Sequence, residues 1–285
     1  MILALGVLAC MAVLFTRSII GTEVIRGFIS AYPGITELPP DAPVGIPAWL
    51  SWQHFLNVFL MVLIIRSGWM VRTENKPPAT WAPRHAKNGS GRISLTLWTH
   101  QALDLLWLVN GIVFVVLLAV TGQWKRVVPT SWDFIPNAAS ALLQYVSLNW
   151  PVENGWTNYN SLQVLTYFVT IFVAAPLAAL TGIRLSPLWK RMPKAMSRAY
   201  PIEVARAIHL PVMFYFVAFI TVHVTLVLAT GALRNLNHMY AGQDVVNWAG
   251  FWIFVVSIAV LVAGWVLARP LFIASIARLF GSVHK

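Results

Sequence analysis

Six long apolar segments determine which fold this chain can adopt. They cover Ile2–Ile20, Trp49–Ile65, Leu95–Thr121, Ser161–Thr181, Ala207–Thr230 and Trp248–Leu267. Each is close to the about 20 residues that an α-helix needs to cross the hydrocarbon core of a bilayer. Backbone N–H and C=O groups must be paired inside that core, so segments of this length are expected to be helices. The sequence therefore predicts an all-α fold, a polytopic membrane bundle of six transmembrane helices.

The composition agrees with a membrane location. Hydrophobic residues make up 58% of the 285 residues and charged residues 10%, whereas soluble domains carry about 25% charged residues. The chain has one cysteine, Cys10, which excludes an internal disulfide, a zinc site made of several cysteines and a Cys-ligated iron–sulfur cluster. Membrane lipid is thus the first partner that the composition predicts.

The distribution of Lys and Arg predicts the topology. Fifteen of the twenty basic residues lie at 66–92, 184–206 and 269–285, three regions that fall on one side if all six segments cross. Basic residues concentrate in cytoplasmic loops, so both termini are expected in the cytoplasm of a bacterial plasma membrane. The segment Gln123–Asn160 is then extracytoplasmic. These loops account for the net charge of +11, so no nucleic-acid partner is predicted.

Four histidines lie in or near the apolar segments at matched depths. His209 and His223 are fourteen residues apart, which places them on one helix face about 21 Å apart along the axis. His54 is near the extracytoplasmic start of the second segment, and His100 is near the cytoplasmic start of the third. We therefore expect an outer pair, His54 with His223, and an inner pair, His100 with His209.

Two such pairs predict two haems with bis-imidazole ligation, each iron bound axially by histidines from two helices. Another metal site, a proton relay and interhelical packing are the alternatives. No cluster of Cys and acidic ligands accompanies the pairs, which argues against a different metal. The remaining three histidines are expected to be ordinary surface residues, although His238 lies in an outer loop that a partner can reach: His85, His238 and His284.

Several short motifs accompany the histidine spacing within Trp52–Gly242. They are HFLN at His54–Asn57, RSG at Arg66–Gly68, NG at Asn110–Gly111, TGQWKRVVP at Thr121–Pro129, YNSLQVLTY at Tyr159–Tyr167 and APLAALTGIRLSP at Ala175–Pro187. With them the chain resembles the prokaryotic di-haem cytochrome b subunits of hydrogenases, formate dehydrogenases and thiosulfate reductases, and the thiosulfate-reductase-like branch most of all.

The resemblance implies ligation of two haem b groups by the four histidines in the same pairing. It also implies three parts: an extra N-terminal helix with a Pro-rich extracytoplasmic loop at 1–48, a four-helix di-haem core at 49–242, and an extra C-terminal helix and tail at 243–285. Such subunits transfer electrons between membrane quinone and an extracytoplasmic oxidoreductase subunit, and the family suggests a partner that contains molybdopterin.

Two other functions stay open at this point. One is a stand-alone b-type cytochrome that oxidises quinol without a catalytic partner. The other is a transporter that uses the intramembrane histidines for proton coupling. No dinucleotide-binding Gly-rich loop or cysteine set is visible, so no catalytic residue is predicted for reduction of a terminal substrate.

Charged residues near the histidines are candidates for the anionic propionates of haem. Arg66, Arg92 and Arg206 are candidates at the inner pair, and Lys125 and Arg126 at the outer pair. Each is also explained as a basic residue of a cytoplasmic loop or as a side chain that extends to the membrane interface.

Asp104 follows His100 by one helical turn and is the acid that we place well inside a predicted span. A carboxylate at membrane depth suggests proton transfer, which quinone reduction requires, or a hydrogen bond to a ligand histidine. The alternative is a polar contact to a neighbouring helix.

Overall fold

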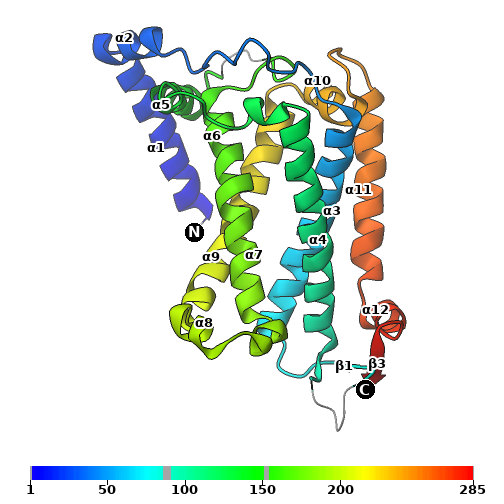
Figure 1. The fold of residues 1–285 in the computed structure, drawn as a ribbon. Coiled ribbons are helices and arrows are strands. Elements are labelled where there is room, and N and C mark those ends of the chain that lie inside the picture. Colours follow the sequence, from blue (N-terminus) through cyan, green and yellow to red (C-terminus); the bar gives the residue numbers. More distant parts are fainter. Residues whose placement is uncertain (1, 86–90, 151–153, 285) are drawn as a thin grey trace.

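Long helices that run roughly along one direction form most of the molecule (Figure 1). The computed structural model describes residues 2–85, 91–150 and 154–284, so Lys87 and Lys285, two of the basic residues counted above, lie outside it. The longest helical segments are α1 (Ile2–Ile20), α3 (Ala48–Thr73), α4 (Leu95–Val120), α6 (Ser161–Val169) with α7 (Ala175–Leu185), α9 (Ile202–Ala229) and α11 (Ala249–Leu267). A π-helical turn, η3 (Thr170–Ala174), joins α6 to α7 without a break.

The number of spans differs slightly from the prediction. Within the described residues, five helices are long and apolar enough to cross a membrane: α3, α4, the continuous α6–α7, α9 and α11. The first apolar segment qualifies only together with α2 (Glu23–Ala31), and the two helices are bent by 85°. The bend has a local cause, because the Thr22 hydroxyl caps α2 by accepting from the Ile25 N–H. The predicted polytopic helical bundle is confirmed, with five spans, or six if the bent pair crosses as one.

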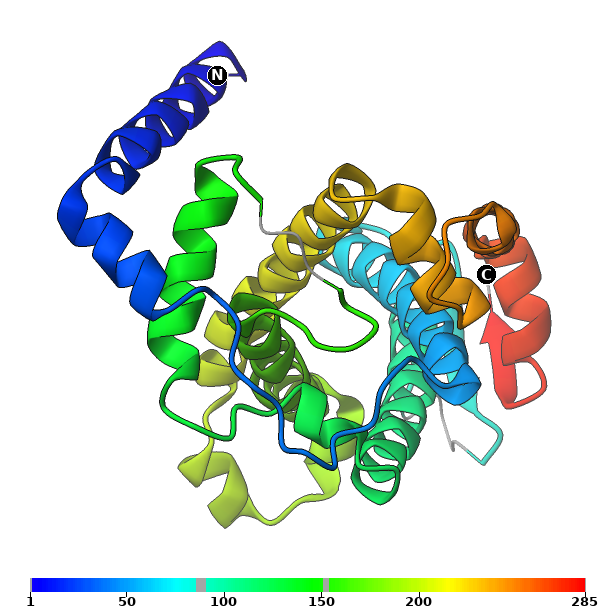
Figure 2. The same ribbon diagram turned by 90° about the horizontal axis from the view of Figure 1, so that it is seen from above.

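Four of the spans surround a common centre. Seen from above, α3, α4, α6–α7 and α9 enclose the middle of the bundle, whereas α1 and α11 lie at its edge (Figure 2). Halfway along the bundle, Ala174, Val212 and Phe216 are buried, and Trp107 and Tyr215 pack against them. Apolar side chains therefore fill the centre at mid-depth.

Polar side chains fix where several spans begin. Ser94 precedes α4 and accepts a hydrogen bond from the Leu97 N–H at 3.0 Å. Asn160 and Gln163 form a capping box at the start of α6. Caps of this kind satisfy N–H groups that have no partner inside the helix. They explain why both helices start where hydropathy predicts.

Short elements close the two ends of the bundle (Figure 1). One end carries η2 (Gln123–Arg126), α5 (Phe134–Val146), α10 (Ala232–Leu236) and η5 (Asn237–Ala241), and the other carries η4 (Pro187–Arg191), α8 (Lys194–Ala199) and α12 (Pro270–Ala277). We call them the outer and inner ends, after the predicted orientation.

A small antiparallel sheet at the inner end was not predicted. Its strands are β1 (Thr80–Pro83), β2 (Ile93–Ser94) and β3 (Gly281–His284), in the order β2-β1-β3. Thr80 is opposite both Ser94 and His284, so the C-terminal tail is tied to the loop between α3 and α4. Gly281 is required in β3 because a Cβ there would overlap the Ala82 carbonyl oxygen.

Candidate functional site

The four intramembrane histidines form two pairs in the centre of the bundle. The ring centroids of His54 on α3 and His223 on α9 are 6.3 Å apart. Those of His100 on α4 and His209 on α9 are 6.4 Å apart. The structure thus brings together the residues that depth predicts, and α9 contributes one member of each pair.

The separation of each pair fits two imidazoles on opposite sides of one metal ion. With about 2 Å for each metal–nitrogen bond and about 1 Å from the nitrogen to the ring centre, the centroids are expected roughly 6 Å apart. Within the described residues, no group of three or more His, Cys, Asp and Glu side chains is placed to hold a metal ion. Two protein ligands for each metal suit a haem iron, whose other four ligands come from the porphyrin.

Hydrogen bonds orient the rings of the inner pair. The Ser67 hydroxyl donates to the Ile64 carbonyl and lies 3.0 Å from His100 Nδ1, so its oxygen accepts from Nδ1–H. The Thr181 hydroxyl donates to the Leu177 carbonyl at 2.6 Å and lies 2.8 Å from His209 Nδ1. A protonated Nδ1 leaves Nε2 with a free lone pair, which is the form of imidazole that binds a metal.

Glycines make room for the same rings. A Cβ on Gly68 would lie 3.0 Å from His100 Cε1, and a Cβ on Gly182 would lie 3.6 Å from His209 Cε1. Ser67 and Gly68 belong to the RSG motif, and Thr181 and Gly182 belong to the motif that ends in LSP. Both motifs therefore support the inner pair directly, a role that the sequence alone does not reveal.

The outer pair lies among aromatic rings and polar atoms without partners. Phe219 stacks on His223 at 5.5 Å, and Tyr240 meets His54 edge-on at 6.1 Å. Among the described residues, four buried side-chain atoms at this end of the bundle have no hydrogen-bond partner: Gln53 Oε1, His54 Nδ1, Arg126 Nε and Asn158 Oδ1. A buried polar atom without a partner costs about 1–3 kcal/mol, and Arg126 Nε–H is the charged donor among them that fits the anionic edge of a cofactor.

Arg126, a predicted propionate partner, is almost completely buried at the outer end, with 1% of its surface exposed. Its guanidinium donates to the carbonyls of Gly45, Gly155 and Trp156 and lies 4.7 Å from the centre of the Tyr159 ring. Arg126 therefore joins the Pro-rich loop before α3 to the loop before α6.

Lys125, the other basic candidate at the outer pair, forms an ion pair with Asp41 in the Pro-rich loop. The Lys125 ammonium holds the pKa of Asp41 below its usual value by hydrogen bonding and charge attraction. This pair is a second link between η2 and the Pro-rich loop.

The basic candidates at the inner pair lie apart from the rings. Arg66 donates to the Trp265 carbonyl on α11, and its guanidinium lies 4.6 Å from the centre of the Trp265 ring. Arg92 and Arg206 are exposed, although Arg206 precedes His209 by one turn of α9. The structure places none of the three side chains in hydrogen-bonding contact with a ring of the inner pair.

Arg184, at the end of α7, was counted in the sequence only as a loop charge. It follows Thr181 by one turn, is largely buried and donates from Nε to the Tyr200 carbonyl at 2.6 Å. Together with Lys190 and Lys194 it lines an open cavity of about 390 Å³ at the inner end. Leu97, one turn before His100, lines the same cavity, so this basic cavity lies directly on the inner side of the inner pair. Because the contact of Thr181 with His209 is visible only in the structure, the sequence carries no signal for Arg184 beyond its charge at the end of an apolar segment.

The prediction for His238 was wrong, because this residue is buried, with 4% of its surface exposed. Its Nε2 lies 2.7 Å from Asp244 Oδ1, and its ring is 5.5 Å from that of Trp156. The hydrogen bond to His238 lowers the pKa of Asp244 below its usual value. His238 lies in the π-helical turn η5, and the polarity of the surrounding sequence does not predict that its side chain is buried. His85 and His284 are exposed as predicted.

Asp104 lies beside the inner pair. Its Oδ2 is 3.6 Å from His100 Nε2, which is longer than a hydrogen bond. The carboxylate is therefore close to His100 Nε2, the nitrogen expected to bind metal, but does not form a hydrogen bond with it.

Comparisons with known proteins agree with this arrangement. The family described as prokaryotic cytochrome b561 matches residues 46–242, more than half of the chain. A curated relative from Azospira oryzae, named "Putative protein-methionine-sulfoxide reductase subunit YedZ1", is 28% identical over 188 residues, which cover 64% of this chain and 88% of that protein. No solved structure matches the chain.

The family match includes both histidine pairs and Asp104, and it leaves out α1, α11 and α12. It confirms the resemblance to prokaryotic cytochrome b subunits. The chain therefore belongs to the prokaryotic cytochrome b561 family and is a multi-pass membrane protein that binds haem b and transfers electrons.

Proposed function

We propose that the chain carries electrons between membrane quinone and an extracytoplasmic oxidoreductase subunit through two haem b groups. The observation that carries this proposal is the presence of two histidine pairs with centroid separations of 6.3 and 6.4 Å. Both pairs share α9, on which their members are about 21 Å apart along the axis. This spacing gives one electron-transfer site near each membrane surface.

Haem supplies reversible one-electron chemistry when it is bound, and the chain would hold it by His54 and His223 at the outer site and by His100 and His209 at the inner site. An apolar cluster also lies between the two sites. Phe216 lies midway between the two histidines of α9 and is buried with Val212 and Ala174. This apolar cluster favours electron transfer over movement of ions between the pairs.

The polarity of the bundle indicates how the inner group would be oriented. The side toward mid-depth is apolar, whereas the cavity on the inner side carries Arg184, Lys190 and Lys194. Burying a carboxylate among apolar side chains costs far more than placing it beside cations. We therefore assign Arg184 to the carboxylate edge of the inner group and Arg126, which has an unpartnered Nε, to that of the outer group.

The name of the Azospira oryzae relative supports a catalytic partner, since it describes a subunit of a protein-methionine-sulfoxide reductase. Together with the resemblance to subunits of respiratory oxidoreductases, this favours a partner that contains molybdopterin. In the proposed orientation, the chain lies in the bacterial plasma membrane with both termini in the cytoplasm, and the partner docks at the outer end.

The test uses the purified full chain in detergent. We expect a b-type reduced-minus-oxidised spectrum, two haems per chain, and reduction of both by a short-chain quinol under anaerobic conditions. A colourless protein would favour the transporter and refute the proposal. Rapid consumption of oxygen by the lone chain with quinol would instead favour the stand-alone quinol oxidoreductase.

Asp104→Asn is expected to slow quinol-dependent haem reduction by about tenfold or more, because a proton acceptor next to the inner site is lost. The haem content reduced by dithionite should not change. Stopped-flow absorbance of the haem bands measures both quantities. Asp133→Asn, at the start of α5 on the outer end, is the control and should behave like the wild type; an unchanged rate in Asp104→Asn would contradict the proton role.

A further inference from the structure

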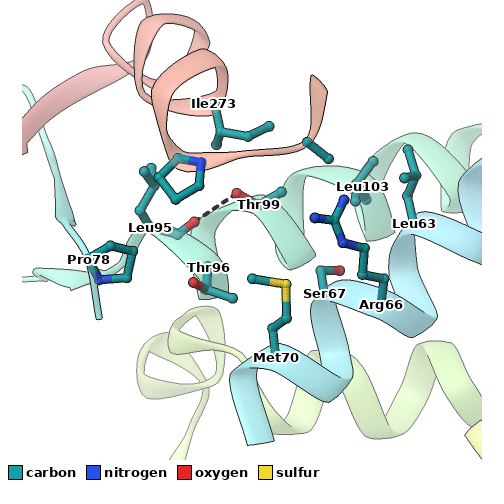
Figure 3. Close-up of a pocket in the computed structure, with 12 residues that line it drawn as sticks. Leu63, Arg66, Ser67, Met70, Pro78, Leu95, Thr96, Thr99, Leu103 and Ile273 are labelled. Carbon is teal, nitrogen blue, oxygen red and sulfur yellow. Dashed lines mark hydrogen bonds between the residues drawn. The ribbon is translucent and has the colours of Figure 1, made fainter. Parts of the chain in front are cut away.

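Two of the hollows at the inner end of the bundle differ strongly in size. The one between α3, α4 and α12, drawn in Figure 3, has a volume of about 30 Å³, which leaves room for about one water molecule. The basic cavity lined by Arg184, Lys190 and Lys194 has a volume of about 390 Å³, within the range of small-molecule sites. Of these two, the basic cavity is the one that can take up a ligand larger than water.

The lining of the basic cavity combines cations with a hydroxyl donor. Arg184 is buried, whereas Lys190 of η4 and Lys194 of α8 are exposed. The Ser197 hydroxyl, also in the lining, accepts from Trp189 Nε1 at 3.0 Å, so its own proton is available to a ligand oxygen. No acidic side chain of the described residues belongs to the lining. The cavity therefore offers positive charge and hydrogen-bond donors, which is what an anionic oxygen requires.

The cations of the cavity have no anionic partner in the part of the chain that the structure describes. None of its ion pairs includes Arg184, Lys190 or Lys194. Arg184 donates from Nε to the Tyr200 carbonyl and is assigned above to the carboxylate edge of the inner group. The two lysines are thus left without a counter-ion. Like charges that share one space repel each other, so the arrangement favours an anion bound between them.

The cavity lies at the depth of the phosphate layer of a membrane. Its lining includes Leu97, the third residue of α4, Leu185, the last residue of α7, and Ile202, the first residue of α9. All three helices belong to membrane spans, and the ends of spans lie where the hydrocarbon meets the polar headgroups. Figure 1 shows α8 at the same end of the bundle. Lipid phosphates are therefore the anions that lie closest to this cavity.

Apolar side chains beside the cavity are placed to contact acyl chains. Met192 lines the cavity and is 41% exposed, and Leu188 and Met196 of the same segment are 59% and 42% exposed. Exposed apolar side chains next to a group of cations match a phospholipid, which carries both a phosphate and acyl chains. A soluble phosphate would make no use of them. The neighbouring surface thus favours a lipid over a free anion.

We propose that the basic cavity binds the phosphate of an anionic phospholipid, with Lys190, Lys194 and the Ser197 hydroxyl as donors and Met192 against the acyl chains. An anionic headgroup fits better than a zwitterionic one, because the described lining has no carboxylate to pair with an ammonium group. The site does not depend on the proposed quinone-linked function, since it requires only that α4, α7 and α9 cross the membrane. The bound lipid holds η4 and α8 against the membrane surface.

The test compares two double variants that remove the same charge from the same segment. Lys190→Gln with Lys194→Gln removes the two exposed cations of the cavity. Arg191→Gln with Arg198→Gln removes two exposed cations that lie outside the lining and is the matched control. Native mass spectrometry of the purified full chain, titrated with phosphatidylglycerol or phosphatidylcholine, gives the dissociation constant of each lipid. Haem content is measured by pyridine haemochrome.

We expect the wild type and the arginine control to bind one phosphatidylglycerol at least tenfold more tightly than phosphatidylcholine. The double Gln variant of the lysines should lose this preference, because the charges that face the phosphate are gone. Lys190→Arg with Lys194→Arg keeps both charges and should retain it. Haem content should be the same in all four proteins.

Four results would overturn the inference and leave the proposed function intact. Wild-type lipid affinity in the lysine variant would exclude the cavity, and an equal loss in the lysine variant and the arginine control would indicate a general attraction to the basic loop. Inorganic phosphate that binds as tightly as the lipid, and is lost with the same lysines, would identify a site for a soluble anion. Loss of haem from the lysine variant would assign the two lysines to the cofactor.

Discussion

Replacing either histidine of one pair with alanine is expected to remove one haem and to leave the other in place. His100→Ala and His209→Ala should lose the inner haem, and His54→Ala and His223→Ala should lose the outer one. The reason is geometric, because each pair has the separation of two axial ligands and the pairs lie at different depths along α9. Haem per chain by pyridine haemochrome and potentiometric titration of the haem bands measure the effect.

Double variants make this expectation specific. If both rings bind one iron, His100→Ala combined with His209→Ala should lose no more haem than either change alone, since residues that act as a unit are not additive. His100→Ala combined with His223→Ala should lose both haems. His85→Ala, which changes an exposed histidine, should retain two. Loss of both haems when His100 and His209 are replaced together, or of only one when His100 and His223 are replaced together, would contradict the pairing.

Arg126→Met is expected to destabilise the protein by about 3 kcal/mol or more. The change removes the donors to three carbonyl groups, those of Gly45, Gly155 and Trp156, and each buried carbonyl left unpaired costs about 1–3 kcal/mol. Thermal unfolding in detergent, with limited proteolysis of the outer loops, measures the loss. The affected contacts join two loops that are distant in sequence, so cleavage is expected before α3 and before α6.

Lys125→Met is the matched control for this change. Its ion pair with Asp41 involves a carboxylate that is 75% exposed, and exposed pairs of this kind contribute little to stability. If Arg126→Met loses one haem but keeps the stability of the wild type, the guanidinium serves the cofactor alone. Loss of stability before loss of haem supports the role in holding the loops together.

The membrane helices and the histidine pairing follow from the sequence because both depend on local regularities. Hydropathy locates the spans, and a helix rises by 1.5 Å per residue, so the depth of a histidine follows from its distance to the end of its segment. Helix ends are less predictable. α3 continues to Thr73, eight residues beyond the predicted Ile65, because a helix persists after it leaves the hydrocarbon and hydropathy falls.

Residues that act across helices were not predictable, since their contacts depend on how each helix is rotated and crossed. Ser67 and Thr181 look like ordinary small polar residues of a span until the structure places them on ring nitrogens. His238 is buried and Trp81 pairs with Val283 because segments that are distant in the sequence come together in the fold.

The shared use of α9 fixes the distance between the two proposed redox centres within one covalent segment. Inserting or deleting one residue between His209 and His223 would shift one imidazole by only about 1.5 Å but turn it by about 100° around the helix axis. Such a change would point that ring away from its partner and abolish one centre, so the fourteen-residue interval tolerates substitutions but not changes in length. A homologue that has one centre is therefore expected to lack a ligand histidine. We do not expect it to have a different number of residues between the two histidine positions of this helix.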